Sequence, residues 1–426
     1  MEKILILLTH TYPYAPPSEQ FLHDEIRVLK DYFDLIIVVP TSHSSWVEES
    51  NKINSKNIIV TRIKRNKIII EIFKTFPNSI LLNINFYREL FGLVNRSVLL
   101  NITAIKTLLI TLINKKIISK YVLNNIISQN VNKNSHVIIY SYWLSYLSNA
   151  SIEIKGKLIN KDYKNVRAIS RAHGSNDVYL GNAMNDYKPG LMDLKYKLDK
   201  IYSISFLGKS YLEKIGFDSR QIVVSRLGVI DNGLKLPKVK KDEFVIVSCS
   251  NLIKIKRVEL IVEALSEIKE YNIHWIHFGD GPERQSIEKR SLEYLNANIR
   301  FDLMGRVKNY DILESYKSTS PDLFINVSSI EGIPVSIMEA ISYGIPVIAT
   351  NVGGTSEVCI DRYNGILLNE DFKIFELVNS IRYFIEMPLD VYRNYCKNAR
   401  KVYEEKYNAE LNYRQFALDI TTELKE

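Results

Sequence analysis

The sequence has 426 residues, of which 46% are hydrophobic and 24% charged, and these values exclude a disordered or fibrous chain. At this length we expect two domains of ordinary size. The net charge of +8 permits contact with phosphates, nucleic acid or an anionic membrane without choosing among them.

The chain shows no sign of an oxidising compartment or of membrane insertion. Its three cysteines are too widely spaced for a disulfide framework or a metal site, which indicates reduced thiols in the cytoplasm: Cys249, Cys359 and Cys396. The first apolar run, residues 4–8, is shorter than a signal peptide requires and is expected to form a buried strand. No stretch reaches 18 uninterrupted apolar residues, so no transmembrane helix is expected.

Apolar runs of strand length recur along the chain and alternate with helical patterns. They occur at residues 4–8, 35–39, 137–140 and 201–204, and again at 244–248, 273–278, 323–326 and 346–349. Such an alternation is typical of parallel sheets covered by helices on both faces. The polar, basic stretch 231–242 is the predicted linker. We therefore expect an α/β fold of two doubly wound domains joined near residue 238.

One segment of the first half leaves two interpretations open. Between Phe86 and Leu123, Leu, Ile and Phe are dense, and basic residues recur among them. The segment could form a pair of core helices, or a basic amphipathic surface that docks on anionic lipid. Periodicity alone does not distinguish a protein core from a membrane as the burial partner.

The most informative pattern follows the third apolar run of the second half. A polar loop carries Glu331, Pro334 opens a helix, and that helix is expected to end at Tyr343 and Gly344. Glu339 then lies about one and a half turns into the helix. Backbone N–H groups at the helix start could hold a phosphate, and carboxylates nearby could accept hydrogen bonds from sugar hydroxyls.

This pattern resembles that of the retaining GT-B glycosyltransferases of family 4, the group 1 glycosyltransferases, among them enzymes that build surface polysaccharides. Their hallmark is a Glu-Gly-x-Pro loop, a second Glu eight positions after the first, and an Ala-x-x-x-Gly-x-Pro-Val helix exit. The corresponding residues here are Glu331-Gly332-Ile333-Pro334, Glu339-Ala340 and Gly344-Ile345-Pro346-Val347. The resemblance implies two Rossmann-like domains that face a central cleft. Residues 1–237 would bind the acceptor, 238–400 the nucleotide-sugar, and 401–426 would form a C-terminal helix that crosses back to the first domain.

The resemblance also implies roles for the residues of this loop and helix. Glu331 would act at the donor sugar as a catalytic residue, and Glu339 would bind the ribose hydroxyls. The remaining contacts with the sugar and the diphosphate would come from Gly332, Ile333, Pro334 and Val335.

A basic cluster follows the first apolar run of the second half. Lys254, Lys256 and Arg257 precede a helical pattern, where their charge would compensate the phosphates of a ligand. The family typically has Gly-Arg-Leu-x-x-x-Lys-Gly here, so the resemblance implies that Lys256 is catalytic and that Arg257 and Asn251 bind the donor. Asn251 brings no positive charge at this place. A solvated, basic helix start is the alternative on charge patterning alone.

Two further donor contacts are implied by resemblance. A strand runs into the Gly279-Asp-Gly-Pro turn, where the family uses Gly-x-Gly-Pro to bring the backbone close to the nucleotide. Arg306 lies in Gly305-Arg-Val, which is similar to the segment that contacts the base. Gly279 and Arg306 are therefore predicted to contact the donor.

The first domain carries two weaker motifs. The segment after its first strand lacks the family's common glycine pair and resembles a Ser-Glu-Thr-Phe variant, so Ser18 and Glu19 are predicted to bind the acceptor. Residues 170–177 resemble an Arg-x-His-Gly segment, which implies a catalytic role for His173 and an acceptor contact for Asp177. The other histidines that we considered are expected to be structural: His10, His43, His136, His274 and His277.

The implied function is a retaining, metal-independent hexosyltransferase of polysaccharide biosynthesis. It would move a hexose or N-acetylhexosamine from a nucleotide-sugar, expected to be a UDP-sugar, to a glycan or lipid-linked glycan acceptor. The product would belong to a bacterial capsule, an exopolysaccharide or an O-antigen. No cofactor is expected because the nucleotide-sugar is a substrate, and no Asp-x-Asp metal motif is present.

The expected location is the cytoplasm, and peripheral contact with the inner face of the cell membrane stays open. Nucleic-acid binding is not expected, because no aromatic and basic module accompanies the net charge. The alternative function is a non-catalytic, nucleotide-sugar-binding partner in a glycosyltransferase complex. It is motivated by Asn251 and by the missing glycine pair.

Overall fold

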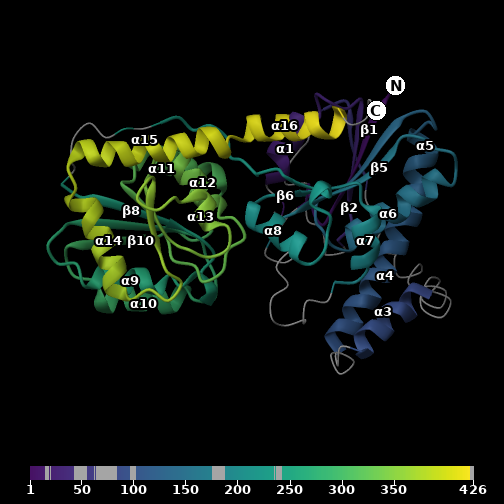
Figure 1. Cartoon of the computed structure of the whole chain (residues 1–426). Helices are drawn as coiled ribbons and strands as arrows, with labels where there is room; N and C mark the ends of the chain where they lie inside the picture. The colour runs from purple at the N-terminus through teal and green to yellow at the C-terminus, as the bar shows by residue number, and fades with distance from the viewer. Residues whose placement is uncertain are drawn as a thin grey trace. The chain divides into compact units, whose positions relative to one another are not determined.

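The chain divides into two units, each built on one parallel sheet (Figure 1). The computed structural model describes residues 1–14, 19, 21–42, 55–61, 63, 84–95, 102–174, 188–234, 236 and 242–422. The first unit comprises Met1–Ser225 with Tyr413–Glu426, and the second comprises Arg226–Asn412. The second unit thus begins before the stretch 231–242, and the C-terminal end of the chain belongs to the first unit.

The first unit contains a seven-stranded parallel sheet with the order β3-β2-β1-β4-β5-β6-β7. Its strands are β1 (Lys3–Thr9), β2 (Leu35–Pro40), β3 (Ile58–Val60), β4 (His136–Ser141), β5 (Val166–Ala172), β6 (Lys200–Ser203) and β7 (Ile222–Val224). β1, β2, β4 and β6 confirm the predicted strands. β3, β5 and β7 were not predicted. β3 and β7 are short, and Arg167, Ser170 and Arg171 interrupt the apolar sequence of β5.

Helices cover both faces of this sheet (Figure 1). The main ones are α1 (Phe21–Leu29), α4 (Ile102–Val122), α6 (Tyr146–Ile159), α7 (Leu191–Lys197), α8 (Phe206–Lys214) and α16 (Ala409–Thr422), whereas α3 (Ile84–Asn95) packs on α4. Alternate residues of β1 point to opposite faces. Ile4, Ile6 and Leu8 pack with residues of α4 and α6, whereas Leu5 and Leu7 pack with residues of α1 and α16.

The segment between Phe86 and Leu123 is helical in its described part, where it forms α3 and α4. α4 packs against α6, and Phe86 packs on a small apolar cluster at the start of α4. Tyr87, Phe91 and Ile110 are exposed. Within the described ranges, none of the helices combines the length and apolar character needed to span a bilayer.

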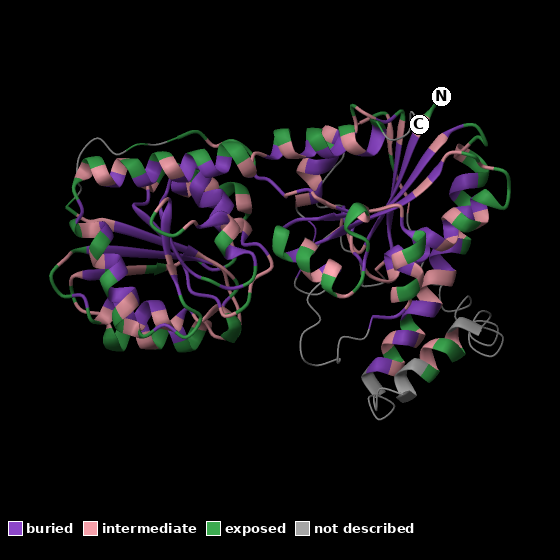
Figure 2. Cartoon of the chain, viewed as in Figure 1, coloured by how far each residue is buried: buried purple, intermediate pink, exposed green. Residues whose placement is uncertain are grey.

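The second unit contains a six-stranded parallel sheet with the order β10-β9-β8-β11-β12-β13. Its strands are β8 (Phe244–Cys249), β9 (Ile273–Phe278), β10 (Ile299–Leu303), β11 (Leu323–Asn326), β12 (Val347–Thr350) and β13 (Gly365–Leu368). β8, β9, β11 and β12 confirm the predicted strands. As Figure 2 shows, the strands are largely buried, while many of the helices expose one side.

The helices of the second unit complete a doubly wound arrangement. They are α9 (Glu259–Ser266), α10 (Arg284–Tyr294), α11 (Asn309–Thr319), α12 (Val335–Ser342), α13 (Thr355–Val358), α14 (Ile374–Glu386) and α15 (Leu389–Lys406). α12 ends at the predicted place, where Gly344 has a φ of +80°. The range 401–426, expected as one C-terminal helix, is divided in its described part between the end of α15 and α16.

Each sheet has one point at which its strand order reverses. In the first unit this point lies between β1 and β4, and in the second it lies between β8 and β11. Doubly wound folds bind ligands at the carboxyl ends of the strands beside such a switch point. A ligand is therefore expected beside the residues that follow these four strands.

Candidate functional site

The candidate site of the second unit lies at the carboxyl ends of β8 and β11. The 3₁₀ turn Lys254–Lys256 follows β8, and the loop that carries Glu331 follows β11. The Lys256 ammonium lies 2.6 Å from Glu331 Oε1, and their side chains are 20% and 11% exposed. Asn326, the last residue of β11, donates from Nδ2 to the same oxygen at 3.2 Å. An ion pair therefore joins the two predicted catalytic residues of this unit across the switch point.

Two glycines allow the Glu331 loop to approach the segment after β12. The Gly354 N–H donates to the Gly332 carbonyl at 2.7 Å. A Cβ on Gly353 would lie 1.8 Å from the Glu331 carbonyl oxygen, and its φ of +55° also favours glycine. Any side chain at position 353 would therefore displace the Glu331 loop.

The predicted diphosphate-binding residues lie at the start of α12. Gly332 and Ile333 precede the helix, Pro334 caps it with φ −78° and ψ 104°, and Val335 is its first residue. The first N–H groups of a helix have no partner within it, and the helix dipole favours an anion there. This end of α12 can therefore bind a phosphate beside Glu331.

Glu339 lies within α12 and is only 7% exposed. Its Oε1 accepts a hydrogen bond from Asn309 Nδ2 at 2.6 Å. Asn309 is the first residue of α11 and was not predicted, because no motif in the sequence marks it. The carboxylate is thus held in place by a partner from the carboxyl end of β10.

Arg257, for which a donor contact stays a prediction, contacts the backbone of the loops around the site. Its guanidinium donates to three backbone carbonyls that follow β11 and β13, those of Val327 at 2.7 Å, Ser328 at 3.3 Å and Glu370 at 2.8 Å. It also lies 5.4 Å from the centre of the Phe372 ring. Burial lowers the pKa of Arg257, although Glu370 and Glu259 oppose this. Arg257 therefore holds loops together around the site.

The other predicted donor contacts border this region without joining the ion pair. The Gly279 N–H donates to the Gly305 carbonyl at 2.9 Å, which places the two predicted nucleotide segments side by side. A Cβ on Gly279 would lie 1.8 Å from the Ser250 carbonyl oxygen. Asn251 and Arg306 are exposed, and among the described residues neither makes a hydrogen bond with Glu331 or Glu339.

A buried hydrogen-bond network supports the end of β8. The Trp275 indole N–H donates to Ser248 Oγ at 2.9 Å, and Ser248 Oγ lies 2.8 Å from His277 Nδ1. His277 Nε2 lies 3.1 Å from the Ser250 carbonyl oxygen and must carry the proton, since a carbonyl can only accept. Burial lowers the pKa of His277 to about 4, so its imidazole is neutral at pH 7.

We expect the second unit to lose stability as the pH falls from about 6.5 to about 4. The unfolded chain takes up a proton on His277 near the ordinary pKa of 6.5, whereas the folded protein does so only near 4. The complete loss corresponds to about 3 kcal/mol in the free energy of unfolding. Thermal unfolding of the wild type and His277→Gln across this range measures it. An equally steep pH dependence in the variant would contradict the assignment.

Cys249, the last residue of β8, lies among the charged groups of the site. Burial and the nearby Glu339 carboxylate raise the pKa of Cys249 to about 12, while Lys256 lowers it. A thiol with this pKa is neutral at pH 7 and is a poor nucleophile. Within the described residues, no group of three or more His, Cys, Asp or Glu side chains is placed to hold a metal ion.

In the first unit, Glu19 organises the loop after β1. Its side chain is buried, and Oε1 accepts from the His10 N–H at 2.8 Å and from the Trp143 indole N–H at 2.7 Å. Oε2 accepts from the N–H groups of Thr11 and Tyr12 at 2.8 and 2.7 Å. Both oxygens therefore hold this loop and Trp143 in place, and the acceptor contact of Glu19 stays a prediction.

His173 lies at the end of β5 and is linked to Glu19 through Trp143. Its Nε2 lies 2.9 Å from the Tyr142 carbonyl oxygen, and its ring packs 4.5 Å from the Tyr142 ring and 4.4 Å from the Trp143 ring. Because a carbonyl oxygen can only accept, His173 Nε2 carries the proton of this hydrogen bond. Ser18 and Asp177 lie outside the described residues.

Comparison with known proteins identifies relatives of the chain. Residues 234–402 match the family model of the glycosyl transferases group 1. The glycosyltransferase WcaL of Escherichia coli K12, named for colanic acid biosynthesis, is 25% identical over 249 residues. The match covers 57% of this chain and 61% of WcaL, so the chain spans about three fifths of that relative's length.

Solved structures show the same fold over the whole chain. A glycosyltransferase from Rickettsia africae has a TM-score of 0.68 at 18% identity, with 100% of this chain and 99% of that chain covered. HepE from Anabaena, solved in complex with UDP and glucose, has a TM-score of 0.65 at 15% identity, with 99% and 100% covered. At these identities the likeness concerns the fold alone.

The sequence match and the structural likeness both include the candidate site. The matched range contains the ion pair at the switch point, the start of α12 and Glu339. The structural likeness extends over both parallel-sheet units. Residues 234–402 are therefore similar to the group 1 glycosyltransferases, and the chain has the GT-B fold of two parallel-sheet domains.

Proposed function

We propose that the chain is a retaining glycosyltransferase that transfers a hexose or N-acetylhexosamine from a UDP-sugar to a glycan or lipid-linked glycan acceptor. The observation that carries the proposal is the ion pair of Lys256 with Glu331. Glu331 lies four residues before Val335, the first residue of α12. This arrangement combines a cation, a helix N-terminus and carboxylates, which together suit a sugar joined to a diphosphate. HepE, which shares the fold, was solved with UDP and glucose, and WcaL is named for colanic acid biosynthesis.

In the proposed reaction, the bond between the anomeric carbon and the diphosphate oxygen breaks. The acceptor hydroxyl oxygen bonds to that carbon on the same face, and its proton passes to the departing diphosphate oxygen. Lys256 and the N–H groups at the start of α12 stabilise the negative charge that develops on the diphosphate. Glu331 binds the sugar, Glu339 binds the ribose, and the catalytic role of His173 stays the one that the sequence resemblance implies. We propose no cofactor and no metal for these steps.

Glu339→Ala is expected to weaken binding of the nucleoside diphosphate by about tenfold to a hundredfold. The variant removes a buried charged acceptor, and such hydrogen bonds contribute about 1.5–3 kcal/mol. Thermal-shift screening with UDP, GDP and ADP identifies the nucleotide, and calorimetric titration measures its dissociation constant. Glu314→Ala, an exposed carboxylate on α11, is the matched control. Absence of nucleotide binding by the wild type, or equal affinity in Glu339→Ala, would contradict the proposed site.

One observation favours the non-catalytic alternative. Asn251 brings no charge, and Arg257 donates to backbone carbonyls, so the donor diphosphate would depend mainly on Lys256 for a cation. A chain that only binds nucleotide-sugar would show UDP affinity without releasing UDP from a UDP-sugar in the presence of membrane or glycan acceptors. Release of UDP that depends on an added acceptor would exclude this alternative.

Peripheral membrane contact of the acceptor-binding unit is part of the proposal. The described part of α3 and α4 exposes Tyr87, Phe91 and Ile110, and Lys106 is exposed on α4. Apolar side chains beside a basic group suit the interface of an anionic membrane. Sedimentation with vesicles that contain phosphatidylglycerol, compared with vesicles of phosphatidylcholine alone, measures this contact. Equal recovery with both vesicles would contradict it.

A further inference from the structure

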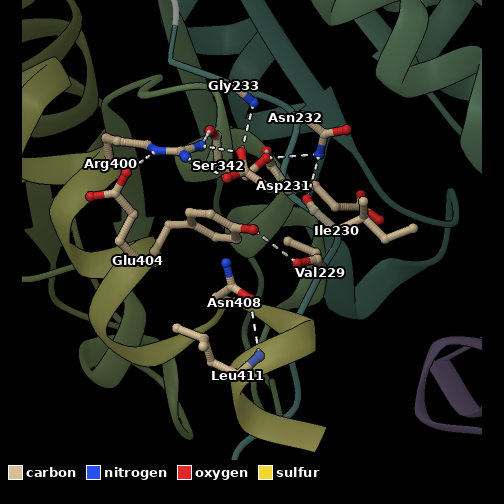
Figure 3. A network of polar contacts seen from close by, with 12 residues as sticks. Val229, Ile230, Asp231, Asn232, Gly233, Ser342, Arg400, Glu404, Asn408 and Leu411 are labelled. Atoms are coloured by element: carbon tan, nitrogen blue, oxygen red, sulfur yellow. Dashed lines mark hydrogen bonds and ion pairs between the residues drawn. The ribbon is translucent and has the colours of Figure 1, made fainter. Parts of the chain in front are cut away.

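A polar network joins the beginning of the second unit to the last turn of α12 (Figure 3). Arg400, on α15, donates to both carboxylate oxygens of Asp231 at 2.7 Å. The same guanidinium donates to the Ser342 carbonyl and to Glu404 Oε1, each at 2.6 Å. The Arg400 side chain is only 10% exposed. A planar guanidinium with all its donor groups engaged holds its partners in a fixed geometry.

Asn232 reaches the same helix end through a side chain. Its Nδ2 donates to Ser342 Oγ at 3.0 Å, and the Ser342 hydroxyl donates to the Glu339 carbonyl at 2.7 Å. The Tyr343 N–H donates to the Ala340 carbonyl, one residue later than a regular α-helix requires. The serine hydroxyl thus supports the Glu339 carbonyl in this tightened turn. A chain of two hydrogen bonds runs from Asn232 to the backbone of Glu339.

These contacts fix the C-terminal end of a short helix. α12 has eight residues, and Arg400 satisfies a carbonyl that has no partner within the helix. A positive charge at this end is also favourable for the helix dipole. The Glu339 carboxylate lies one turn before Ser342, and productive binding geometry tolerates errors of only about 0.5 Å. A small rotation of α12 would therefore move the Glu339 carboxylate away from the position in which it binds its ligand.

We propose that Asp231 and Asn232 are positioning residues for Glu339. Asn232 holds the Ser342 hydroxyl, and Asp231 holds the Arg400 guanidinium that donates to the Ser342 carbonyl. Together they fix the rotation of α12 and so the carboxylate that binds the donor ribose. This inference rests on the proposed function, because it concerns the same donor site. The competing explanation is that the network only attaches residues 231–232 to the second unit.

A double-mutant cycle on the full-length chain tests the proposal. The dissociation constant of the nucleoside diphosphate that the wild type binds, among UDP, GDP and ADP, is measured by calorimetry. We expect Asn232→Ala to raise this constant about fivefold in the wild-type background. In the Glu339→Gln background, Asn232→Ala should produce no further change, because the group that it positions is already lost. Asp231→Asn should behave in the same way, and Asp231→Glu should restore part of the affinity.

A matched control separates this effect from a general weakening of α15. Glu405→Gln removes an exposed ion pair with Lys401 on the same helix and should leave the dissociation constant unchanged. The proposal is overturned if Asn232→Ala has no effect, or if its effect is equal in the two Glu339 backgrounds. Thermal unfolding of each variant shows whether the chain remains folded.

The outcome also separates this proposal from the proposed function. If the wild type binds a nucleotide and Glu339→Gln weakens that binding, the donor site stands whatever Asn232→Ala does. If the wild type binds no nucleoside diphosphate, the donor site fails, and the positioning role fails with it.

Discussion

Lys256→Ala is expected to lower the single-turnover rate of sugar transfer by about two to three orders of magnitude. Removing one preorganised group that stabilises developing negative charge costs catalysis on this scale. In the free protein the Lys256 ammonium is balanced by Glu331 at 2.6 Å. During transfer the diphosphate gains charge, and Lys256 is the cation that we place beside it. The donor dissociation constant should change much less than the rate, because the stabilised charge develops mainly in the transition state.

Lys254→Ala is the matched control for this prediction. Lys254 lies in the same 3₁₀ turn, but its side chain is exposed, whereas that of Lys256 is 20% exposed and paired with Glu331. Its removal changes the net charge equally, so a general electrostatic effect would slow both variants to a similar extent. Single-turnover rates at saturating donor distinguish the two cases. A similar loss in both variants, or an unchanged rate in Lys256→Ala, would exclude the assigned role.

Most of the strands that the sequence predicts are apolar runs. β1, β2 and β8 are of this kind, and β9 is predicted although it contains His274 and His277. The short apolar strand β13 is not predicted. β5 is equally buried but contains Arg171, whose partners come from distant parts of the chain. Burial of a charged residue depends on tertiary contacts, and no local pattern reports them.

In the candidate site, too, the backbone conformation could be predicted from the sequence, whereas the contacts of the side chains could not. Turn and helix positions such as Pro334 and Gly344 are determined by local conformational preferences, so the bounds of α12 could be predicted. Side-chain partners could not be predicted, because they lie far apart in sequence. Glu19 has the appearance of a ligand in a polar loop, but its oxygens accept hydrogen bonds from backbone N–H groups and from Trp143. Asn309 was not predicted because no sequence motif marks it, although its side chain donates a hydrogen bond to Glu339, 30 residues away.

Arg257 shows how a departure from the family pattern can be accommodated. The family typically has glycine at this position, and here Arg257 adopts a φ of +49°. For a residue other than glycine, this left-handed backbone conformation costs about 1 kcal/mol or more. Its guanidinium compensates by donating to the Val327, Ser328 and Glu370 carbonyls. Arg257 thus holds the loops around the site together.

The largest loss of stability is expected for Glu25→Gln in the first unit. Glu25 and Arg171 are fully buried, and Glu25 Oε2 lies 3.1 Å from Arg171 Nη2. The Tyr140 hydroxyl donates to Glu25 Oε1 at 2.8 Å and accepts from Arg171 Nε at 2.7 Å. Burial alone would lower the pKa of Arg171, but Glu25 raises it above its ordinary value, so the guanidinium is charged. Glutamine keeps the shape of Glu25 and removes the compensating charge.

The uncompensated guanidinium should cost about 3–5 kcal/mol in the free energy of unfolding, measured by urea denaturation. Replacing both partners with apolar residues, as in Glu25→Leu with Arg171→Met, should cost less than Glu25→Gln alone, because no buried charge is then left unpaired. Asp218→Asn, which breaks an exposed pair with Arg220 in the same unit, should leave the unfolding midpoint unchanged. If the double variant is less stable than Glu25→Gln, the loss reflects packing against Phe416, which lies 4.5 Å from the Arg171 guanidinium. The buried charge would then not be its cause.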